Sequence, residues 1–360
     1  MTFAFAAAGT GGHLVPAIAV ADELVRRGVD ASDIVFFGGE RLEVAAVPAA
    51  GFELVQLDIR GLRRSLSLQN LGLPWMVRSA ARRVGDELRA RSGGVLAAFR
   101  GYVTVPAGMG ASSAGYPLVL HEQNAVPGLA NRIATRRAAR TLVAFPASLD
   151  RLAGSELTGN PLPERIASFD REALGADAMA GYGLDPERLV LGVFGGSQGA
   201  AALNDLVSDL ADSLLDAGHS ILHITGPANH DAVAASAADH PGWVTVPYEA
   251  EMDRFYAASD LVVSRAGAMT VSELTATGTP AIVVPLPAGR GYQAENATEM
   301  EQAGGCVIVA QDDTTRLQAH IEQILADEGK RSGMASAAAS VGRPDATRMV
   351  ADAVLEVADG

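Results

Sequence analysis

Short apolar segments rich in β-branched residues alternate with helical patterns along most of the chain, and this alternation limits the fold more than any other feature. Such an alternation is typical of parallel sheets whose strands are joined by crossover helices. In the first half, the pattern predicts strands at residues 3–8, 34–38, 54–57, 95–99, 118–121 and 142–145. It predicts helices there at residues 14–27, 41–49, about 68–91, 106–114 and 127–137.

The second half of the chain repeats the scheme. The predicted strands are residues 189–194, 221–225, 244–247, 261–264, 281–285 and 307–309. The predicted helices are residues 200–216, 251–258, 270–277, 293–303 and 315–326, with a last amphipathic helix at 346–357. Because each half begins with an apolar strand, a glycine loop and a helix, we expect an α/β protein with two Rossmann-like, doubly wound domains facing each other across a cleft.

A break in the pattern separates the two halves. Gly159-Asn160-Pro161, extended by Pro163, is the best candidate for an interdomain linker. We therefore expect a first domain at residues 1–162 and a second at residues 163–342. Residues 343–360 are expected to form a C-terminal helix that packs back on the first domain.

The composition is that of a globular protein. Apolar residues make up 48% of the chain and charged residues 19%, which favours sizeable cores over disorder. The single cysteine, Cys306, allows no internal disulfide and is expected to be a buried, inert thiol in a reducing cytoplasm. Neither a secretory leader nor an apolar run of the roughly 20 residues that a membrane span needs is recognisable.

Charge is distributed unevenly along the chain. Up to Leu162 there are 17 basic and 13 acidic residues, whereas the remainder has 11 basic and 29 acidic residues. This difference suggests that the two halves face different partners. The net charge of −14 makes nucleic acid an unsuitable partner.

Two glycine loops are the first candidate binding elements. Gly9-Thr10-Gly11-Gly12-His13 follows the first strand, and the segment 195–200 follows the first strand of the second half. Glycines let a phosphate approach the backbone closely, and the next helix offers unpaired N–H groups. A tight turn explains either loop alone equally well, but two loops at equivalent places favour ligand binding.

A dinucleotide is the obvious alternative ligand. The first loop does not have the spacing G-x-G-x-x-G, because His13 and Leu14 follow the paired glycines. Glu40 follows the second predicted strand, where an acid can bind a ribose, but it starts a helical pattern. The sequence therefore argues against NAD.

Four segments together resemble glycosyltransferase family 28, and within it the UDP-GlcNAc:undecaprenyl-diphospho-muramoylpentapeptide N-acetylglucosaminyltransferases. They are the first glycine loop with Pro16, the run His121-Glu122-Gln123-Asn124, residues 195–200, and residues 264–273. The resemblance covers nearly the whole chain in the family's order. It implies the GT-B fold, with the donor nucleotide in the C-terminal domain and the acceptor lipid on the N-terminal domain.

The implied reaction is an inverting transfer of GlcNAc to the C4 hydroxyl of MurNAc-pentapeptide on undecaprenyl diphosphate, which converts lipid I to lipid II in peptidoglycan synthesis. The resemblance assigns UDP-GlcNAc contacts to Thr10, Gly11, Gly12, Asn124, Arg165, Ser197, Glu249, Ala268, Met269, Thr270, Val271, Ser272, Glu273 and Gln293. Thr10, Gly11 and Gly12 are also expected to line the acceptor side.

Individual roles follow from the same resemblance. Ser197 is expected to bind phosphate, Gln293 with Asn296 to bind the donor sugar, and the backbone at Glu249 to contact uracil. Glu273 is expected to accept hydrogen bonds from both ribose hydroxyls, as one carboxylate can. Without the motif, Glu273 would be interpreted as a first-turn helix acid.

The chain departs from the family pattern at three places. Arg100 and Pro163 replace residues that are commonly glycine and arginine, and Tyr292 stands where glutamine or histidine is common. Arg165, two residues beyond Pro163, is the candidate replacement for the arginine that contacts the donor.

His13 is the candidate catalytic base. An inverting transfer needs a group that takes the proton of the attacking hydroxyl, and histidine titrates in the useful range. The alternative is that His13 only orients the phosphate or the substrate, and the sequence favours neither interpretation.

Residues 60–91 form the candidate membrane-facing stretch. They contain eight arginines and two acids, with leucines and Trp75 between them. A basic segment with an apolar centre suits an anionic bilayer surface, although an ordinary amphipathic helix has a similar pattern. The family's lipid-facing region lies here, so we expect a peripheral protein on the cytoplasmic face of the cell membrane.

No D-x-D motif and no cluster with metal-ligand spacing is recognisable, so we expect no metal or cofactor, with stimulation by a divalent cation left open. The expected partners are UDP-GlcNAc, lipid I and the anionic inner-membrane surface, with cell-wall assembly proteins as further candidates. Three alternatives remain: a glycolipid synthase, a UDP-GlcNAc 2-epimerase, and a non-catalytic scaffold that binds a UDP-sugar.

Overall fold

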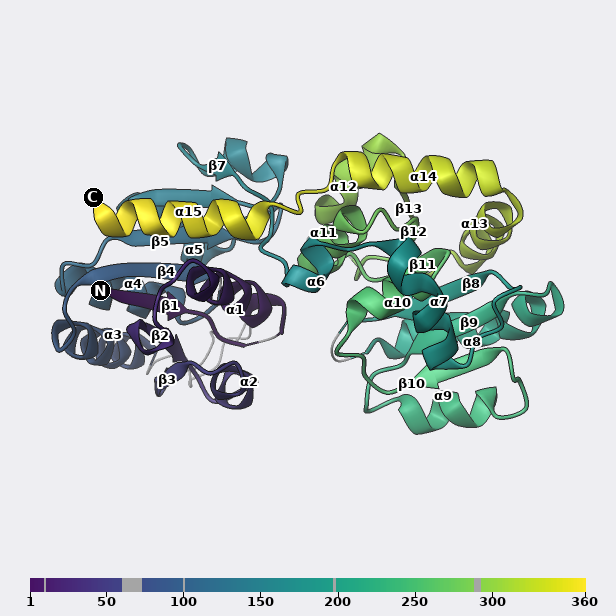
Figure 1. Ribbon diagram of the computed structural model, residues 1–360, viewed down its shortest axis with the longest axis horizontal. Coiled ribbons are helices and arrows are strands. Elements are labelled where there is room, and N and C mark those ends of the chain that lie inside the picture. Colours follow the sequence, from purple (N-terminus) through teal and green to yellow (C-terminus); the bar gives the residue numbers. More distant parts are fainter. Residues whose placement is uncertain (10, 60–72, 100, 197–198, 288–292) are drawn as a thin grey trace. The chain divides into compact units, whose positions relative to one another are not determined.

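The computed structural model spans Met1 to Gly360 and describes residues 1–9, 11–59, 73–99, 101–196, 199–287 and 293–360. The chain divides into two compact units (Figure 1). The first contains Met1–Pro163 together with Asp345–Gly360, and the second contains Glu164–Pro344. The C-terminal residues therefore return to the unit in which the chain begins.

In the described part of the first unit, seven parallel strands form one sheet in the order β3-β2-β1-β4-β5-β6-β7. The strands are β1 (Thr2–Ala6), β2 (Ile34–Gly38), β3 (Glu53–Gln56), β4 (Gly94–Phe99), β5 (Leu118–Glu122), β6 (Arg140–Val143) and β7 (Glu156–Leu157). The strand order reverses beside β1, because the chain adds β2 and β3 on one side and β4 on the other. Ligands bind at such switch points in open α/β sheets.

Helices cover both faces of this sheet. They are α1 (Gly11–Arg26), α2 (Glu43–Ala49), α3 (Leu73–Arg89), α4 (Thr104–Ser113), α5 (Leu129–Ala134) and α15 (Ala346–Asp359), with 3-10 turns at Ala31–Asp33, Thr135–Arg137 and Pro146–Arg151. Because side chains alternate along a strand, Phe3 and Phe5 of β1 pack with α1 and α15, while Ala4 and Ala6 pack with α3 and α4.

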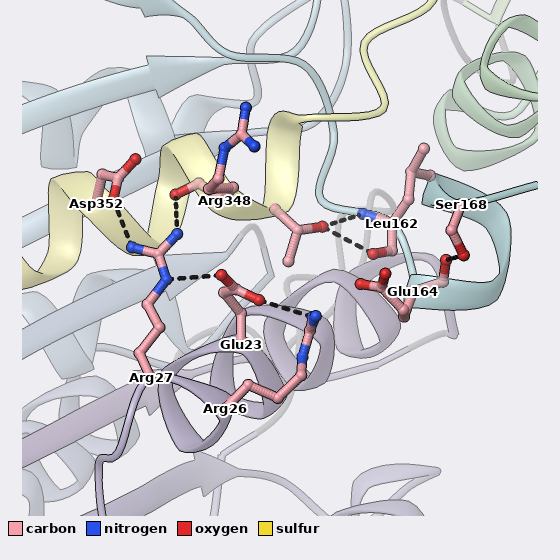
Figure 2. A network of polar contacts seen from close by, with 9 residues as sticks. Glu23, Arg26, Arg27, Leu162, Glu164, Ser168, Arg348 and Asp352 are labelled. Carbon is pink, nitrogen blue, oxygen red and sulfur yellow. Dashed lines mark hydrogen bonds and ion pairs between the residues drawn. The ribbon is translucent and has the colours of Figure 1, made fainter.

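The C-terminal helix α15 is fixed to α1 by both apolar and polar contacts. Val350 and Val354 are buried in the core that α1 shares. Figure 2 shows Arg27, the residue that follows α1, between Glu23 of α1 and Asp352 of α15, and its guanidinium also donates to the carbonyl of Arg348.

The hydroxyl of Thr347, also in α15, makes two bonds with the backbone of Leu162. It accepts from the Leu162 N–H at 2.8 Å and donates to the Leu162 carbonyl at 2.7 Å. Both groups are buried. The side chain thus joins the end of the first polypeptide segment of this unit to the start of its last helix.

In the described part of the second unit, six parallel strands form a sheet in the order β10-β9-β8-β11-β12-β13. The strands are β8 (Val190–Phe194), β9 (Ser220–Ile224), β10 (Trp243–Val246), β11 (Leu261–Ser264), β12 (Ala281–Val283) and β13 (Cys306–Ile308). The helices are α6 (Glu164–Ala167), α7 (Arg171–Tyr182), α8 (Ala201–Asp216), α9 (His230–Ala237), α10 (Met252–Ala258), α11 (Ala268–Ala276), α12 (Gln293–Ala303), α13 (Thr314–Ala326) and α14 (Glu328–Ser340).

The strand order of this sheet reverses beside β8, as it does beside β1 in the first unit. Leu191 and Val193 pack with α8 and α13 on one face. On the other face Phe194 packs against Phe255 and Tyr256 of α10, with ring centroids 5.3 and 6.1 Å apart. Two doubly wound, Rossmann-like units are therefore confirmed.

Several element boundaries differ from the predictions. The helix predicted at 127–137 is two pieces, because α5 ends at Ala134 and a 3-10 turn follows. The strand predicted at 281–285 ends at Val283, and the Val284 carbonyl accepts a bond from Arg265. The elements β7, α6, α7, α9 and α14 were not predicted.

Cys306 is buried as expected, and burial raises the pKa of its thiol to about 12, with a smaller effect of Glu301. No helix within the described ranges is long and apolar enough to cross a membrane.

Candidate functional site

The first glycine loop places His13 in the opening turn of α1. Gly9 has a φ of +115°, which favours glycine, and α1 begins at Gly11. Gly11 and Gly12 therefore lie in the turn whose N–H groups have no partner within the helix. Thr10 lies outside the described residues.

The ring of His13 contacts the carbonyl oxygen of Ala8 through Nδ1, at 3.1 Å. A carbonyl oxygen can only accept, so this bond requires the hydrogen on Nδ1. The neutral ring then has its lone pair on Nε2. This is the tautomer that can take a proton through Nε2.

Glu43 lies beneath the glycine loop and is completely buried. Its carboxylate accepts from the N–H of Gly39 at 2.7 Å, the N–H of Gly9 at 3.3 Å and the hydroxyl of Tyr102 at 3.4 Å. Burial, and then the negative charge of Glu43, raises the pKa of Tyr102 to about 12. One carboxylate thus joins the turns after β1 and β2.

The run His121–Asn124 is fixed by a second buried carboxylate. Glu122 accepts from the N–H groups of Asn124 and Gly128 and from the amide of Asn131, each at 3.0 Å. These three donors satisfy a charge that would otherwise be costly to bury. Asn124, the predicted ligand, is half-buried at the carboxyl end of β5.

His121 is buried within the first unit. Its Nε2 lies 2.9 Å from the Gly159 carbonyl. Burial lowers the pKa of His121 to about 4, so the ring stays neutral at physiological pH. It packs on Phe99 and connects β5 to the segment that ends the first part of the unit.

The second glycine loop joins β8 to α8. Gly199 has a φ of +72°, and a Cβ there would lie 2.4 Å from the Thr225 carbonyl oxygen, so only glycine fits. The amide of Asn204 donates to the same oxygen at 2.9 Å and holds it in place. The N-terminus of α8 therefore follows a tight loop and suits an anion. The predicted phosphate ligand Ser197 lies outside the described residues.

The segment from Ser264 to Glu273 joins β11 to α11. Gly267 caps the helix, and Ala268, Met269, Thr270 and Ser272 are half-buried in its first turns. Val271 is 2% exposed and packs into the core, so only its backbone can face a ligand.

Glu273 is held by a tyrosine. The hydroxyl of Tyr256 donates to Glu273 Oε2 at 2.8 Å. Burial raises the pKa of Glu273 to about 7, while the bond from Tyr256 and the charge of Arg165 act in the opposite direction. A carboxyl with this pKa lies between its neutral and charged forms near physiological pH.

Gln293 and Asn296 both contact neighbouring loops. Gln293 Oε1 accepts from the Leu286 N–H at 3.1 Å, so its NH₂ group is the part suited to donate to a sugar. Asn296 donates to the carbonyl of Ala266 at 3.1 Å. Arg265 adds a further connection, because it donates to the carbonyl of Val284 and to the side chain of Gln311.

Arg165 and Glu249 both make contacts with the segment that precedes α10. Arg165 donates to the carbonyl of Ala250 at 2.7 Å and lies 3.5 Å from Asp253. Glu249 accepts from the hydroxyl of Tyr182 at 2.5 Å and from the N–H of Glu251 at 2.7 Å. The side chain of Glu249 is therefore engaged within the protein, and its backbone is the part suited to a ligand.

Three groups of predicted donor residues in the second unit follow neighbouring strands, whereas Arg165 lies in α6 and Glu249 follows the edge strand β10. The glycine loop follows β8, the helix-start segment follows β11, and Gln293 begins the helix after β12. Strands β8, β11 and β12 are neighbours in the sheet, so their carboxyl ends meet at one edge. The structure thus brings these predicted residues to the edge where open α/β sheets bind ligands.

Sequence reasoning missed two residues that hold candidate site elements in place, Glu43 at the first glycine loop and Tyr256 beside Glu273. In the sequence, the one indication of a role for Glu43 is its place after the pair Gly38-Gly39. Tyr256 offers no such indication, because it resembles any aromatic residue of an apolar helix. The binding roles of the predicted residues themselves stay predictions.

Two sequence models match the chain. The glycosyltransferase family 28 N-terminal domain matches residues 3–143, and the glycosyltransferase family 28 C-terminal domain matches residues 190–350. Together they cover most of both units.

Full-length relatives agree with these matches. The UDP-N-acetylglucosamine–N-acetylmuramyl-(pentapeptide) pyrophosphoryl-undecaprenol N-acetylglucosamine transferase of Mycolicibacterium smegmatis is 42% identical over 98% of this chain and 93% of its own length. The transferase of the same name from Thermobifida fusca is 38% identical over 100% of this chain and 95% of its own.

A solved structure extends the similarity to the fold. The crystal structure of Acinetobacter baumannii MurG is 27% identical and superposes with a TM-score of 0.77, covering 99% of this chain and 100% of that one. With its two glycine loops at equivalent edges of two Rossmann-like sheets, the chain belongs to glycosyltransferase family 28 and has the GT-B fold.

Proposed function

We propose that this protein transfers GlcNAc from UDP-GlcNAc to the C4 hydroxyl of MurNAc-pentapeptide on undecaprenyl diphosphate, with inversion at the anomeric carbon. The observation that carries the proposal is the 42% identity, over 98% of the chain, to a transferase whose name states this donor and this acceptor. The product would be lipid II for peptidoglycan synthesis.

The second unit would bind the donor. The N-terminus of α8 and the glycine loop before it offer N–H groups to the diphosphate. Glu273 would accept from the ribose hydroxyls, the backbone at Glu249 would contact uracil, and Gln293 would donate to the sugar. The contacts of Glu249 and Gln293 within the protein support these roles, because they hold each residue in one orientation.

His13 would act as the base. The acceptor oxygen forms a bond to the anomeric carbon, the bond from that carbon to UDP breaks, and the acceptor proton passes to Nε2 of His13. The bond from Nδ1 to the Ala8 carbonyl supports this role because it keeps the lone pair on Nε2. Backbone N–H groups at the helix N-terminus would stabilise the negative charge of the departing UDP.

We also propose that the first unit binds peripherally to an anionic membrane on its cytoplasmic face. Trp75 at the start of α3 is 77% exposed, and Arg78, Arg82 and Arg83 follow it on the exposed side of the same helix. Leu129 and Ile133 of α5 are 71% and 52% exposed. Large exposed apolar side chains beside arginines suit the surface of an anionic bilayer. Residues 60–72 of the predicted stretch lie outside the described residues.

UDP release is the test that separates this function from its alternatives. The purified protein is incubated with UDP-GlcNAc with and without a short-chain lipid I analogue. The proposal predicts release of UDP only when the acceptor is present. Epimerisation or UDP release without acceptor would indicate an epimerase. Binding of UDP-GlcNAc without turnover in either case would indicate a different acceptor, as for a glycolipid synthase, or a scaffold.

A further inference from the structure

A buried tyrosine contacts the carboxylate proposed to bind the ribose of the donor. Tyr256 in α10 is completely buried, and its hydroxyl lies 2.8 Å from Oε2 of Glu273 in α11. The two residues are 17 positions apart in the sequence and belong to different helices. The bond is therefore a product of tertiary packing.

The position of the Tyr256 hydroxyl is fixed by an aromatic cluster. Its ring lies against Phe194 and Phe255, with centroid distances of 6.1 and 5.6 Å and nearly perpendicular planes. Phe194 is the last residue of β8, directly before the second glycine loop. The ring that positions the hydroxyl thus packs on the strand that carries the loop.

The geometry leaves the carboxylate suited to a diol. A carboxylate has about four acceptor positions, and Tyr256 occupies one of them on Oε2. The remaining positions can accept the two ribose hydroxyls. Because the tyrosine donates, it favours the charged carboxylate, which is the form that can accept from both hydroxyls.

We propose that Tyr256 is a positioning residue for donor binding, whose hydroxyl orients the Glu273 carboxylate and keeps it charged for the ribose of a uridine nucleotide. This inference rests on the proposed function, because it requires that Glu273 bind the ribose. Among the described residues, the groups that act on Glu273 are Tyr256 from α10 and Arg165 from α6. Burial opposes both, so the charged form depends on these two groups.

The test is the affinity for UDP as a function of pH, measured by calorimetry on the full chain. In the wild type, affinity should fall as the pH drops through about 7, because Glu273 becomes protonated. In Tyr256→Phe the carboxyl loses a donor, its pKa rises, and the fall should begin at a higher pH. At neutral pH the variant should bind UDP roughly tenfold more weakly, as for one hydrogen bond to a charged group.

A matched control and a second variant separate this inference from the proposed function. Tyr116→Phe removes a buried hydroxyl in the first unit, and UDP affinity should not change. Glu273→Gln should weaken UDP binding and remove its pH dependence near 7. If Glu273→Gln binds UDP like the wild type, the ribose role of Glu273 is wrong. If Glu273→Gln weakens binding while Tyr256→Phe keeps both affinity and pH dependence, the inference for Tyr256 is overturned.

The double variant Tyr256→Phe/Glu273→Gln completes the cycle. If the tyrosine acts through the carboxylate, the double variant should bind UDP as Glu273→Gln does. If the two losses simply add, Tyr256 acts on the fold and the positioning role is overturned.

Discussion

At the scale of single residues, the hydrogen bond between Nδ1 of His13 and the Ala8 carbonyl determines which ring nitrogen can accept a proton. The Ala8 carbonyl is an acceptor, so it selects the ring tautomer with a basic Nε2. The sequence could place His13 on a glycine loop but could not reveal the tautomer, because the Ala8 carbonyl direction depends on how β1 ends. The motif thus predicts which residue is the candidate base, whereas the fold determines the tautomer of its ring.

Replacing His13 tests its role as the base. His13→Ala should lower kcat by about 100-fold or more, the usual contribution of a positioned general base. The affinity for UDP should stay within about twofold, since the donor is assigned to other residues. Steady-state kinetics with the lipid acceptor and calorimetry with UDP measure the two quantities.

His240→Ala is the matched control, because this half-buried histidine contacts Asp212 at 3.5 Å and the ring of Trp243, and has no proposed role in binding or catalysis. It should retain wild-type turnover. Near-normal kcat in His13→Ala would contradict the base role and leave His13 an orienting residue.

At the scale of elements, two buried carboxylates hold the loops that follow the strands. Glu43 joins the turns after β1 and β2, and Glu122 closes the loop after β5. Neither role could be predicted from the sequence, because the donors are backbone N–H groups whose directions depend on the folded turns. What the sequence did show was the strand, the loop and the helix around each carboxylate.

Glu43→Gln tests the first of these carboxylates. The amide keeps the shape of the side chain, but its NH₂ group faces the N–H donors of Gly9 or Gly39, so a buried donor loses its acceptor. We expect a loss of about 1–3 kcal/mol in the free energy of unfolding. Urea titration measures this loss, and an increased KM for the lipid acceptor should accompany it.

Glu40→Gln is the control, because Glu40 is exposed three residues earlier. Its free energy of unfolding should change by less than about 0.5 kcal/mol. Equal stability of the Glu43 and Glu40 variants would contradict the anchoring role of Glu43.

The attachment of helix α15 to the backbone of Leu162 depends on Thr347, in the first turn of the helix. Thr347→Val keeps the side-chain volume but removes the group that pairs with the buried N–H and carbonyl of Leu162. The free energy of unfolding should fall by about 1–3 kcal/mol. Thr315→Val, at an exposed position of α13, should change it by less than about 0.5 kcal/mol. A loss no larger at Thr347 than at Thr315 would show that the pairing with Leu162 contributes nothing to stability.

The predicted and missed elements differ in how many large apolar residues they bury. Strands β1, β2 and β8 are buried along their whole length, so their apolar runs are unmistakable. Helix α7 buries only Ala178, and α14 buries Met334 and Ala338. A helix built from alanine, glycine and serine has no clear apolar stripe, which is why periodicity missed both.

At the scale of the whole molecule, the chain uses the same scaffold twice and gives its two halves different charges. Both sheets reverse their strand order beside the first strand of the unit, and each has a glycine loop after that strand. The scaffold was predictable because it depends on the order and spacing of apolar segments. The support of the donor edge by Tyr256, Arg265 and Asn204 was not, because those contacts join segments far apart in the sequence.

Membrane association should depend on the exposed face of α3. We expect the protein to bind vesicles that contain phosphatidylglycerol and to be released by salt, because exposed charges are screened. Trp75→Ala should weaken this binding severalfold, because it removes a large exposed apolar group. Sedimentation with vesicles measures the bound fraction.

Met349→Ala is the control, since Met349 is 43% exposed on α15 and lies outside the proposed surface. It should bind vesicles like the wild type. Equal binding to neutral and anionic vesicles, or no effect of Trp75→Ala, would contradict the proposed surface.

The central claim is the transfer reaction itself, and the most direct measurement follows labelled GlcNAc from UDP-GlcNAc into lipid. The wild-type protein should produce one labelled lipid, dependent on the lipid I analogue, in which a β-linked GlcNAc is attached to the C4 oxygen of MurNAc. Label that stays with the nucleotide, or that enters a lipid without MurNAc, would contradict the assignment of this chain as the transferase that makes lipid II.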